Sequence, residues 1–415
     1  MPAKLPLEVL YLVIDHAKAD DTSINWTKTQ RRALGRSLAL TCRALRRVGS
    51  SLVWLEVVQQ VATDVRLLRQ VVEHPRVANV LSVLSLDARS YDGPRTEFSG
   101  CDDLLVHLTN LTTLSLRDFP PSLSKRLFAR TSLPVEQTLR SFTYRDPKSC
   151  EPRTDLHHLF QTIARFENLT SLSLILHLRS RNDAANYHDA AIAEEAEDLV
   201  ALASTFEQKS LETVRLFFRE GLRSPPPVMV ETILRIVLTK LVRVDALRVL
   251  AVTSIVDVSN DAAAWLLEFP HLEKLHLVLS FAALANLTPT LLRRLPSFGH
   301  LRVLQFVHAG HGPVVERTVT APRRKLVEFL DALAPSLETL ELSISFREGV
   351  TGGILGPFLL KRKLLPLRVV RCTVRDLETD ERCAVWIRKE RVDLGGTDGA
   401  RWAINKERSV EVTYL

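Results

Sequence analysis

The stretch Leu111-Thr-Thr-Leu114-Ser-Leu116 decides how the rest of the chain is interpreted. Side chains alternate along a β-strand, so Leu114 and Leu116 point to one side while Thr113 and Ser115 point to the other. The same six-residue frame, apolar at its first, fourth and sixth positions, recurs along the chain at unequal intervals. Its copies are Leu81-Leu84-Leu86, Leu111-Leu114-Leu116, Leu139-Phe142-Tyr144, Leu169-Leu172-Leu174, Leu211-Val214-Leu216, Leu247-Leu250-Val252, Leu272-Leu275-Leu277, Leu301-Leu304-Phe306, Leu337-Leu340-Leu342 and Leu367-Val370-Cys372. This recurrence predicts an array of repeated units that stack and share one hydrophobic core.

The frame resembles the strand signature L-x-x-L-x-L of leucine-rich repeats. The resemblance implies an α/β solenoid over residues 57–377, with parallel strands on its concave face, helices on its convex face and about ten or eleven irregular repeats. Apolar residues at helical spacing between the frames support a unit of strand, turn and helix. We expect helices at 61–72, 156–166, 228–241, 262–266 and 326–333, and a surface loop followed by a longer helix in the long unit that carries 179–197. Leu52-Leu55-Val57 is interpreted as a first, imperfect frame, and residues 378–415 as a C-terminal cap.

One position departs from the leucine-rich-repeat signature. The signature places Asn or Cys eight residues after the first leucine. The ten corresponding residues are Arg89, Phe119, Pro147, His177, Arg219, Ile255, Ser280, Ala309, Ser345 and Arg375. We therefore expect irregular repeats whose turns are closed in other ways.

Residues 1–56 precede the array and contain two amphipathic helical stretches. The segments L-P-L-E-V-L at 5–10 and L-A-L-T-C-R-A-L-R-R at 38–47, with Trp54, resemble the F-box, although residues 18–33 are more polar than that family usually shows. The resemblance implies an all-α domain that docks a Skp-type adaptor. The implied contact residues are Leu5, Pro6, Val9, Leu10, Ile14, Leu40 and Leu45. The alternative is a plain helical cap over the open end of the array, which repeat proteins need for solubility.

Residues between the core positions of each frame are predicted to face away from the core and toward a partner. Those between the second and third core residues are Ser85, Ser115, Thr143, Ser173, Arg215, Ala251, His276, Gln305, Glu341 and Arg371. Two residues earlier stand Val83, Thr113, Ser141, Ser171, Thr213, Val249, Lys274, Val303, Thr339 and Val369. Arginine and aromatic side chains contribute strongly to interfaces. The candidate substrate-binding residues are therefore Arg117, Arg145, Arg215, Phe217, His276, Glu341 and Arg371, unless these are ordinary solvated strand residues.

No motif for chemistry is recognised in the sequence. Phosphate-binding glycine loops, the nucleophile elbow G-x-S-x-G and the zinc motif H-E-x-x-H are absent from it. His157-His158 and His308-x-x-His311 lack accompanying cysteines or carboxylates, so we expect neither a metal nor a cofactor. The chain is thus predicted not to be an enzyme.

Composition narrows the location and the class of partner. The five cysteines are dispersed, which is typical of a reduced intracellular protein, and no apolar run is long enough to span a membrane. A net charge of +7 over 415 residues is too weak to indicate nucleic acid. We therefore expect a cytoplasmic or nuclear protein, or one found in both compartments, that binds neither membranes nor nucleic acid.

Together the two resemblances imply a function. An F-box followed by leucine-rich repeats implies the substrate-recognition subunit of a cullin–RING ubiquitin ligase, whose Skp-type adaptor binds the F-box and whose protein substrate binds the repeats. The first alternative is a leucine-rich-repeat interaction scaffold without a role in ubiquitin transfer. The second is an RNA-associated repeat protein, which a continuous arginine stripe along the open strands would favour. The positions quoted above do not show such a stripe.

Overall fold

The structure is a computed structural model of the 415-residue chain. It describes residues 56–60, 81–87, 104–118, 121–130, 132–146, 155–178, 188–218, 226–254, 259–279, 290–291, 293–308, 333, 336–346, 369–376, 382–392 and 401–409. Only Glu56 of the predicted N-terminal helical domain belongs to the described residues. The predicted helices at 61–72 and, apart from Leu333, at 326–333 also lie outside them.

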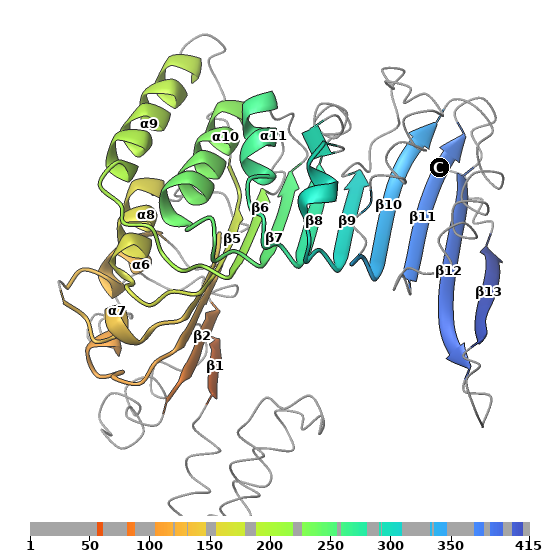
Figure 1. Cartoon of the computed structure of the whole chain (residues 1–415). Coiled ribbons are helices and arrows are strands. Elements are labelled where there is room, and N and C mark those ends of the chain that lie inside the picture. Colours follow the sequence, from red (N-terminus) through yellow and green to blue (C-terminus); the bar gives the residue numbers. More distant parts are fainter. Residues whose placement is uncertain are drawn as a thin grey trace, which may run out of the picture. The chain divides into compact units, whose positions relative to one another are not determined.

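The described residues form a mixed α/β structure in two compact units, Met1–Leu169 and Thr170–Leu415 (Figure 1). The elements of the first unit are β1 (Glu56–Gln60), β2 (Val83–Asp87), η2 (Leu104–Val106), β3 (Thr113–Arg117), α6 (Pro121–Leu127), α7 (Val135–Thr138), β4 (Ser141–Arg145) and α8 (Leu156–Arg165). Strands β1 to β4 pair in sequence order, and every pair is parallel.

The second unit follows the same plan over more strands. Its elements are β5 (Ser171–Leu176), α9 (His188–Ala203), β6 (Thr213–Phe218), α10 (Pro227–Arg235), the π-helix η3 (Ile236–Leu241), β7 (Val249–Ser254), α11 (Asn260–Leu266), β8 (Lys274–Leu279), η4 (Leu295–Ser297), β9 (Val303–His308), β10 (Thr339–Phe346), β11 (Val369–Asp376), β12 (Arg382–Val392) and β13 (Arg401–Ser409). Strands β5 to β11 are parallel, and β12 and β13 continue the sheet in antiparallel pairing. Helices α9, α10 and α11 stand side by side next to these strands (Figure 1).

The ten sequence frames coincide with strands β2 to β11. Each of these strands begins two residues after the first leucine of its frame, as β3 does at Thr113 after Leu111. Equivalent frame positions are also paired, so Leu114 lies in register with Leu84 and Phe142. The predicted frame alignment within each unit is therefore confirmed, despite the unequal lengths of the connecting segments.

The first strand corrects one detail of the sequence interpretation. Glu56 of β1 pairs with Val83 of β2, so Val57 is equivalent to Leu84. The proposed frame Leu52-Leu55-Val57 places Leu55 at that position instead, two residues too early. A shift of two residues keeps each side chain on its predicted face, because the period of a strand is two. The hydrophobic alternation alone therefore could not distinguish the two registers.

Within each unit, the strands have one covered face and one open face. The core positions of the frames, such as Leu114, Leu116 and Leu275, are fully buried. Alternate residues such as Thr113 and Ser115 are only partly covered. A fully buried leucine contributes roughly 1.5–3 kcal/mol, so the covered face supplies most of the stability, and the open face is free to vary.

Backbone hydrogen bonds link the start of several strands to the preceding frame. The N–H groups of Arg140 and Ser141 both donate to the carbonyl of Thr112, at 2.8 and 2.9 Å. The second unit repeats this pattern, for example where Arg302 and Val303 donate to Glu273 at 2.8 and 3.0 Å. The ladder satisfies backbone groups that would otherwise be left without partners. These bonds lie at the start of the strands, whereas the missing asparagine positions follow the strands.

In the second unit, charged side chains of alternating sign stand just before the strands, at the second position of the frames. The residue after the first leucine of each frame is Glu212, Arg248, Glu273, Arg302 and Glu338 in turn. The Arg302 guanidinium and the Glu338 carboxylate form an ion pair at 2.7 Å. Opposite charges on neighbouring strands stabilise a register and like charges destabilise it. The alternation therefore favours the observed register of neighbouring strands over a shifted register.

The connecting helices match the predicted positions where both are described. The predicted ranges 156–166, 228–241 and 262–266 overlap α8, α10 with η3, and α11, and α10 and α11 begin one and two residues earlier than predicted. The long fourth segment contains the sixteen-residue helix α9, as the sequence predicts. The structure adds an unforeseen feature after residue 377, because β12 and β13 reverse direction and extend the sheet.

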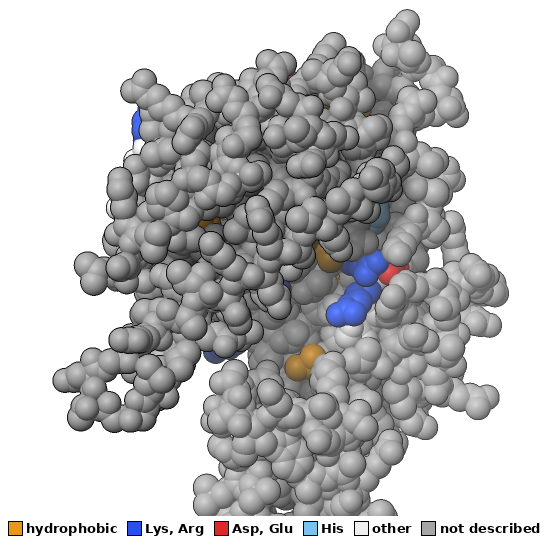
Figure 2. Space-filling model, turned by 90° about the vertical axis from the view of Figure 1, so that its right-hand side faces the viewer, with side chains coloured by type: hydrophobic (Ala, Val, Ile, Leu, Met, Phe, Trp, Pro, Cys, Tyr) orange, Lys and Arg blue, Asp and Glu red, His pale blue; other side chains and the backbone are white. Residues whose placement is uncertain are grey.

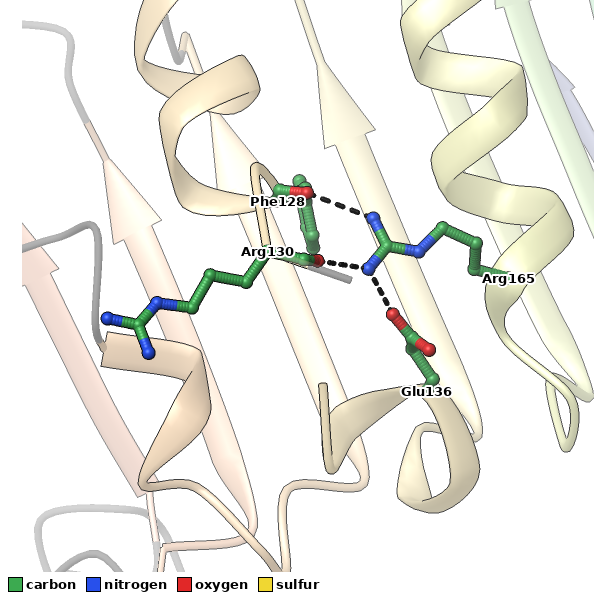
Figure 3. A network of polar contacts seen from close by, with 4 residues as sticks. All are labelled: Phe128, Arg130, Glu136 and Arg165. Atoms are coloured by element: carbon green, nitrogen blue, oxygen red, sulfur yellow. Dashed lines mark hydrogen bonds and ion pairs between the residues drawn. The ribbon is translucent and has the colours of Figure 1, made fainter. Parts of the chain in front are cut away.

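A polar network ties the end of α8 to earlier parts of the first unit (Figure 3). The Arg165 guanidinium donates to the carbonyl of Phe128 at 2.9 Å. It also donates to the carbonyl of Arg130 and forms an ion pair with Glu136, on α7. The next residue, Phe166, packs against Phe128 and Phe142 at ring-centroid distances of 6.0 and 5.3 Å. Arg165 therefore links segments that come from three different parts of the sequence.

The start of α8 is fixed by Asp155. Its side chain accepts a hydrogen bond from the His158 N–H at 2.9 Å, as an N-cap does. The Lys125 ammonium group of α6 lies 2.5 Å from the same carboxylate. Burial raises the pKa of Asp155, but the His158 N–H and Lys125 outweigh burial, so the pKa is lowered overall. The carboxylate is thus held in its charged form.

We expect Asp155→Ala to destabilise the protein by about 1 kcal/mol, because the cap of α8 is lost. Asp155→Asn is the matched control, because it keeps an acceptor for the cap and removes only the charge facing Lys125. A lowered pKa stabilises the folded state above the unfolded-state pKa, and this contribution is lost as the pH falls through the folded-state value. The advantage of the native chain over Asp155→Asn should therefore shrink below about pH 4. Urea unfolding at several pH values measures both effects, and a pH-independent difference would contradict the charge argument.

Candidate functional site

The open face of the second unit brings together side chains from widely separated frames. Register places Arg215 of β6 next to Ala251 of β7, which lies next to His276 of β8. The row continues through Gln305 of β9 to Glu341 of β10. Neighbouring strands are about 4.8 Å apart, so Arg215 and Glu341 stand at backbone positions about 19 Å apart. From β6 to β10 the row therefore runs from a basic to an acidic position, and Arg371 of β11 follows Glu341 in register.

Three side chains near the basic position of β6 form the Arg215 cluster, which consists of Arg215, Lys274 and His276. Arg215 and Lys274 are exposed, and His276 is half-buried. Burial lowers the pKa of His276, and the positive charges of Arg215 and Lys274 lower it further. A hydrogen bond with Gln305 and the charge of Glu341 oppose this shift without cancelling it. The imidazole is thus held largely in its neutral form beside two positively charged side chains. In Figure 2, Lys and Arg side chains lie together on the face toward the viewer, beside an acidic and a histidine side chain.

The two cations of the cluster have no counter-ion among the described residues. Neither Arg215 nor Lys274 forms an ion pair there. Ala251, between Arg215 and His276, contributes only a methyl group, so it does not extend from the sheet as far as its neighbours do. The charges of the cluster are therefore available to a ligand rather than used to stabilise the fold.

Apolar side chains run beside the cluster, two residues further along the strands. They are Ile175 of β5, Phe217 of β6 and Val278 of β8, and all three are half-buried on the open face. Thr253 of β7 lies in register between Phe217 and Val278. The open face thus combines positive charge with an adjacent apolar strip, a composition typical of protein-binding surfaces.

The predicted residues of the first unit lie at the ends of β3 and β4. Arg117 is exposed, and its Nε donates to the Ser115 hydroxyl at 3.4 Å. The Arg145 Nε lies 3.7 Å from the Asp118 carboxylate, and only 17% of the Arg145 side chain is exposed. The Asp118 N–H also donates to the Arg145 carbonyl at 2.9 Å. Arg145 therefore helps to join two strands and offers little surface to a partner.

The structure brings together some of the predicted residues and not others. Arg215, Phe217, His276 and Glu341 share the open face of the second unit, and Arg371 is paired by register with Glu341. Nothing more is described for the Arg371 side chain. The predicted adaptor-binding residues Leu5, Pro6, Val9, Leu10, Ile14, Leu40 and Leu45 lie outside the described residues.

Lys274 and Gln305 were not selected from the sequence, although both were placed on the open face. Their link to His276 depends on contacts between different strands and, for Lys274, on its position two residues before His276 in one strand. The sequence signal that identifies Lys274 and Gln305 is the alternation of side chains along a strand. When neighbouring frames are aligned, this alternation places both residues on the same face as His276. Selecting arginines and aromatic residues one at a time overlooked it.

The described residues contain no group of three or more histidine, cysteine, aspartate or glutamate side chains that could hold a metal ion. None of the described helices is long and apolar enough to cross a bilayer. Comparison of the chain with protein-family models and with curated proteins gave no match.

Proposed function

We propose that the chain is a non-enzymatic recognition subunit, built as a leucine-rich-repeat solenoid, whose open strands bind a protein partner. One observation carries this proposal. The frames keep their register within each unit, so one side chain per strand from Ser173 to Glu341 forms a continuous row on an open face. A fold that needs only its covered face for stability leaves such a row available for recognition.

A protein partner fits the row better than RNA does. Among the described open-face positions of β5 to β10, Arg215 and Lys274 are the only arginine or lysine, and they stand beside apolar Phe217 and Val278. Binding to a nucleic-acid backbone needs many cations, because each phosphate contact neutralises one charge. Two cations beside an apolar strip are instead typical of a protein interface.

The F-box resemblance of residues 1–56 extends the proposal to a place in a larger complex. The N-terminal segment would dock a Skp-type adaptor of a cullin–RING ubiquitin ligase, and the open strands would hold the substrate. The reaction itself would belong to the partners, and this chain would contribute proximity. Without the adaptor, the same open face would serve a scaffold that has no role in ubiquitin transfer.

Adaptor capture distinguishes the ligase subunit from the scaffold. We expect the full chain to co-purify with a Skp-type adaptor, and we expect Leu5→Ala/Pro6→Ala/Leu10→Ala to reduce capture at least tenfold. A tenfold loss corresponds to about 1.4 kcal/mol, a modest demand for three apolar contacts. Arg235→Ala/Arg293→Ala/Arg294→Ala is the matched control, because these three arginines are exposed and lie outside the N-terminal segment. Absence of capture, or capture that the first triple variant does not reduce, would reject the ligase role and leave the scaffold.

A further inference from the structure

The charge of the open face in the second unit is divided unevenly among its strands. Among the described open-face positions of β5 to β10, Arg215 and Lys274 are positive and Glu341 is the acid. Glu341 lies two strands beyond His276, so its backbone position is about 10 Å from that of the histidine. The net charge of these positions is therefore +2 − 1 = +1 when His276 is neutral, and the positive part lies over β6 to β8.

From this distribution we propose that Arg215, Lys274 and His276 bind a carboxylate side chain of a partner protein. A bulky apolar side chain, two residues away in the partner, rests on Phe217 and Val278. The inference rests on the proposed function, since it assumes that the partner is a protein and binds the open face. The inference adds the chemical character of the partner segment that the open face recognises.

The spacing of the face supports an acidic residue and an apolar residue separated by one position. Arg215 and Phe217 are i and i+2 in β6, so both project from the same face about 7 Å apart. An extended segment has the same spacing between its own i and i+2 side chains. A glutamate opposite Arg215 therefore places the second side chain opposite Phe217.

His276 gives this site a dependence on pH. The groups that face it are Arg215 from β6, Lys274 from its own strand and Glu341 from β10, while β7 and β9 contribute the uncharged Ala251 and Gln305. A bound carboxylate offsets the two positive charges that disfavour the imidazolium, so the pKa of His276 rises on binding. Binding then takes up a proton, and affinity must strengthen as the pH falls.

The test uses the full chain and a fluorescent eight-residue peptide of serine and glycine that carries one glutamate and, two residues later, one leucine. We expect this peptide to bind, and we expect binding to weaken at least tenfold when glutamine replaces its glutamate. The protein variant Arg215→Gln/Lys274→Gln should also bind the glutamate peptide at least tenfold more weakly than the native chain does. Arg235→Gln/Arg294→Gln is the matched control, because it removes two exposed arginines outside the strands and should leave binding unchanged. Fluorescence polarisation measures each dissociation constant.

Two further comparisons distinguish this carboxylate site from other kinds of site. Affinity should rise several-fold between pH 7.5 and pH 5.5, and His276→Gln should abolish this rise. Binding of a phosphoserine peptide in place of the glutamate peptide would reject a carboxylate partner. Equal binding of the glutamate and glutamine peptides, or no binding at all, would overturn the site even if the Skp-type adaptor is captured. Peptide binding without adaptor capture would keep the site and reject only the ligase role.

Discussion

Leu114→Asp should prevent the first unit from folding at ordinary temperature. Leu114 lies in the middle of β3, is fully buried, and stands in register with Leu84 and Phe142 of the neighbouring strands. The substitution removes about 1.5–3 kcal/mol of hydrophobic burial, and an unpaired buried carboxylate adds several kcal/mol more. A loss above about 5 kcal/mol is comparable with the whole stability of a typical domain.

The adjacent residue provides the matched control for this prediction. Ser115 is half-buried on the open face and accepts its hydrogen bond from Arg117, so Ser115→Asp should change stability by less than about 0.5 kcal/mol. Hydrogen exchange measured by mass spectrometry on peptides from 111–146 reports on this unit directly. Protection that survives Leu114→Asp, or that Ser115→Asp removes equally, would contradict the assignment of one covered and one open face.

These two neighbouring residues also show why the strands could be predicted from the sequence. A buried position tolerates few side chains, so the core residues of the frames repeat although the segments between them vary in length. The same constraint predicted the paired positions within each unit. It does not apply to β12 and β13, because Arg382–Val392 and Arg401–Ser409 carry no such frame and run antiparallel. The sequence therefore indicated a C-terminal cap but not its strands.

The candidate site was less predictable because its charges interact across frames. Arg145 was a candidate because arginine is common in interfaces, but Asp118, with a left-handed backbone φ of 52°, places its carboxylate beside Arg145. Aspartate adopts this conformation more readily than most residues do, yet no local pattern specified it here. The environment of His276 depends on Arg215, which lies two frames earlier in the sequence, and on Glu341, which lies two frames later. Such neighbours become apparent only when the strands are aligned in register.

Arg165→Met should destabilise the first unit by about 2–3 kcal/mol, the expected scale for losing hydrogen bonds to a charged group. Methionine keeps much of the apolar stem but donates nothing to the carbonyls of Phe128 and Arg130 or to Glu136. The Arg165 and Glu136 side chains are 29% and 17% exposed, so solvent weakens the ion pair without removing it. Urea unfolding combined with hydrogen exchange over 155–166 measures the loss and assigns it to this region.

The geometry of the guanidinium, rather than its charge alone, should account for most of this effect. Arg165→Lys keeps the charge beside Glu136, but a single ammonium group cannot reproduce the fork that contacts two carbonyls and a carboxylate, so we expect about half the loss. Arg243→Met is the matched control in the second unit, because its ion pair with Asp245 is 50% and 62% exposed and should contribute little to stability. Full rescue by lysine would show that only the charge matters. Equal losses from Arg165→Met and Arg243→Met would mean that the network in Figure 3 adds nothing beyond an ordinary surface pair.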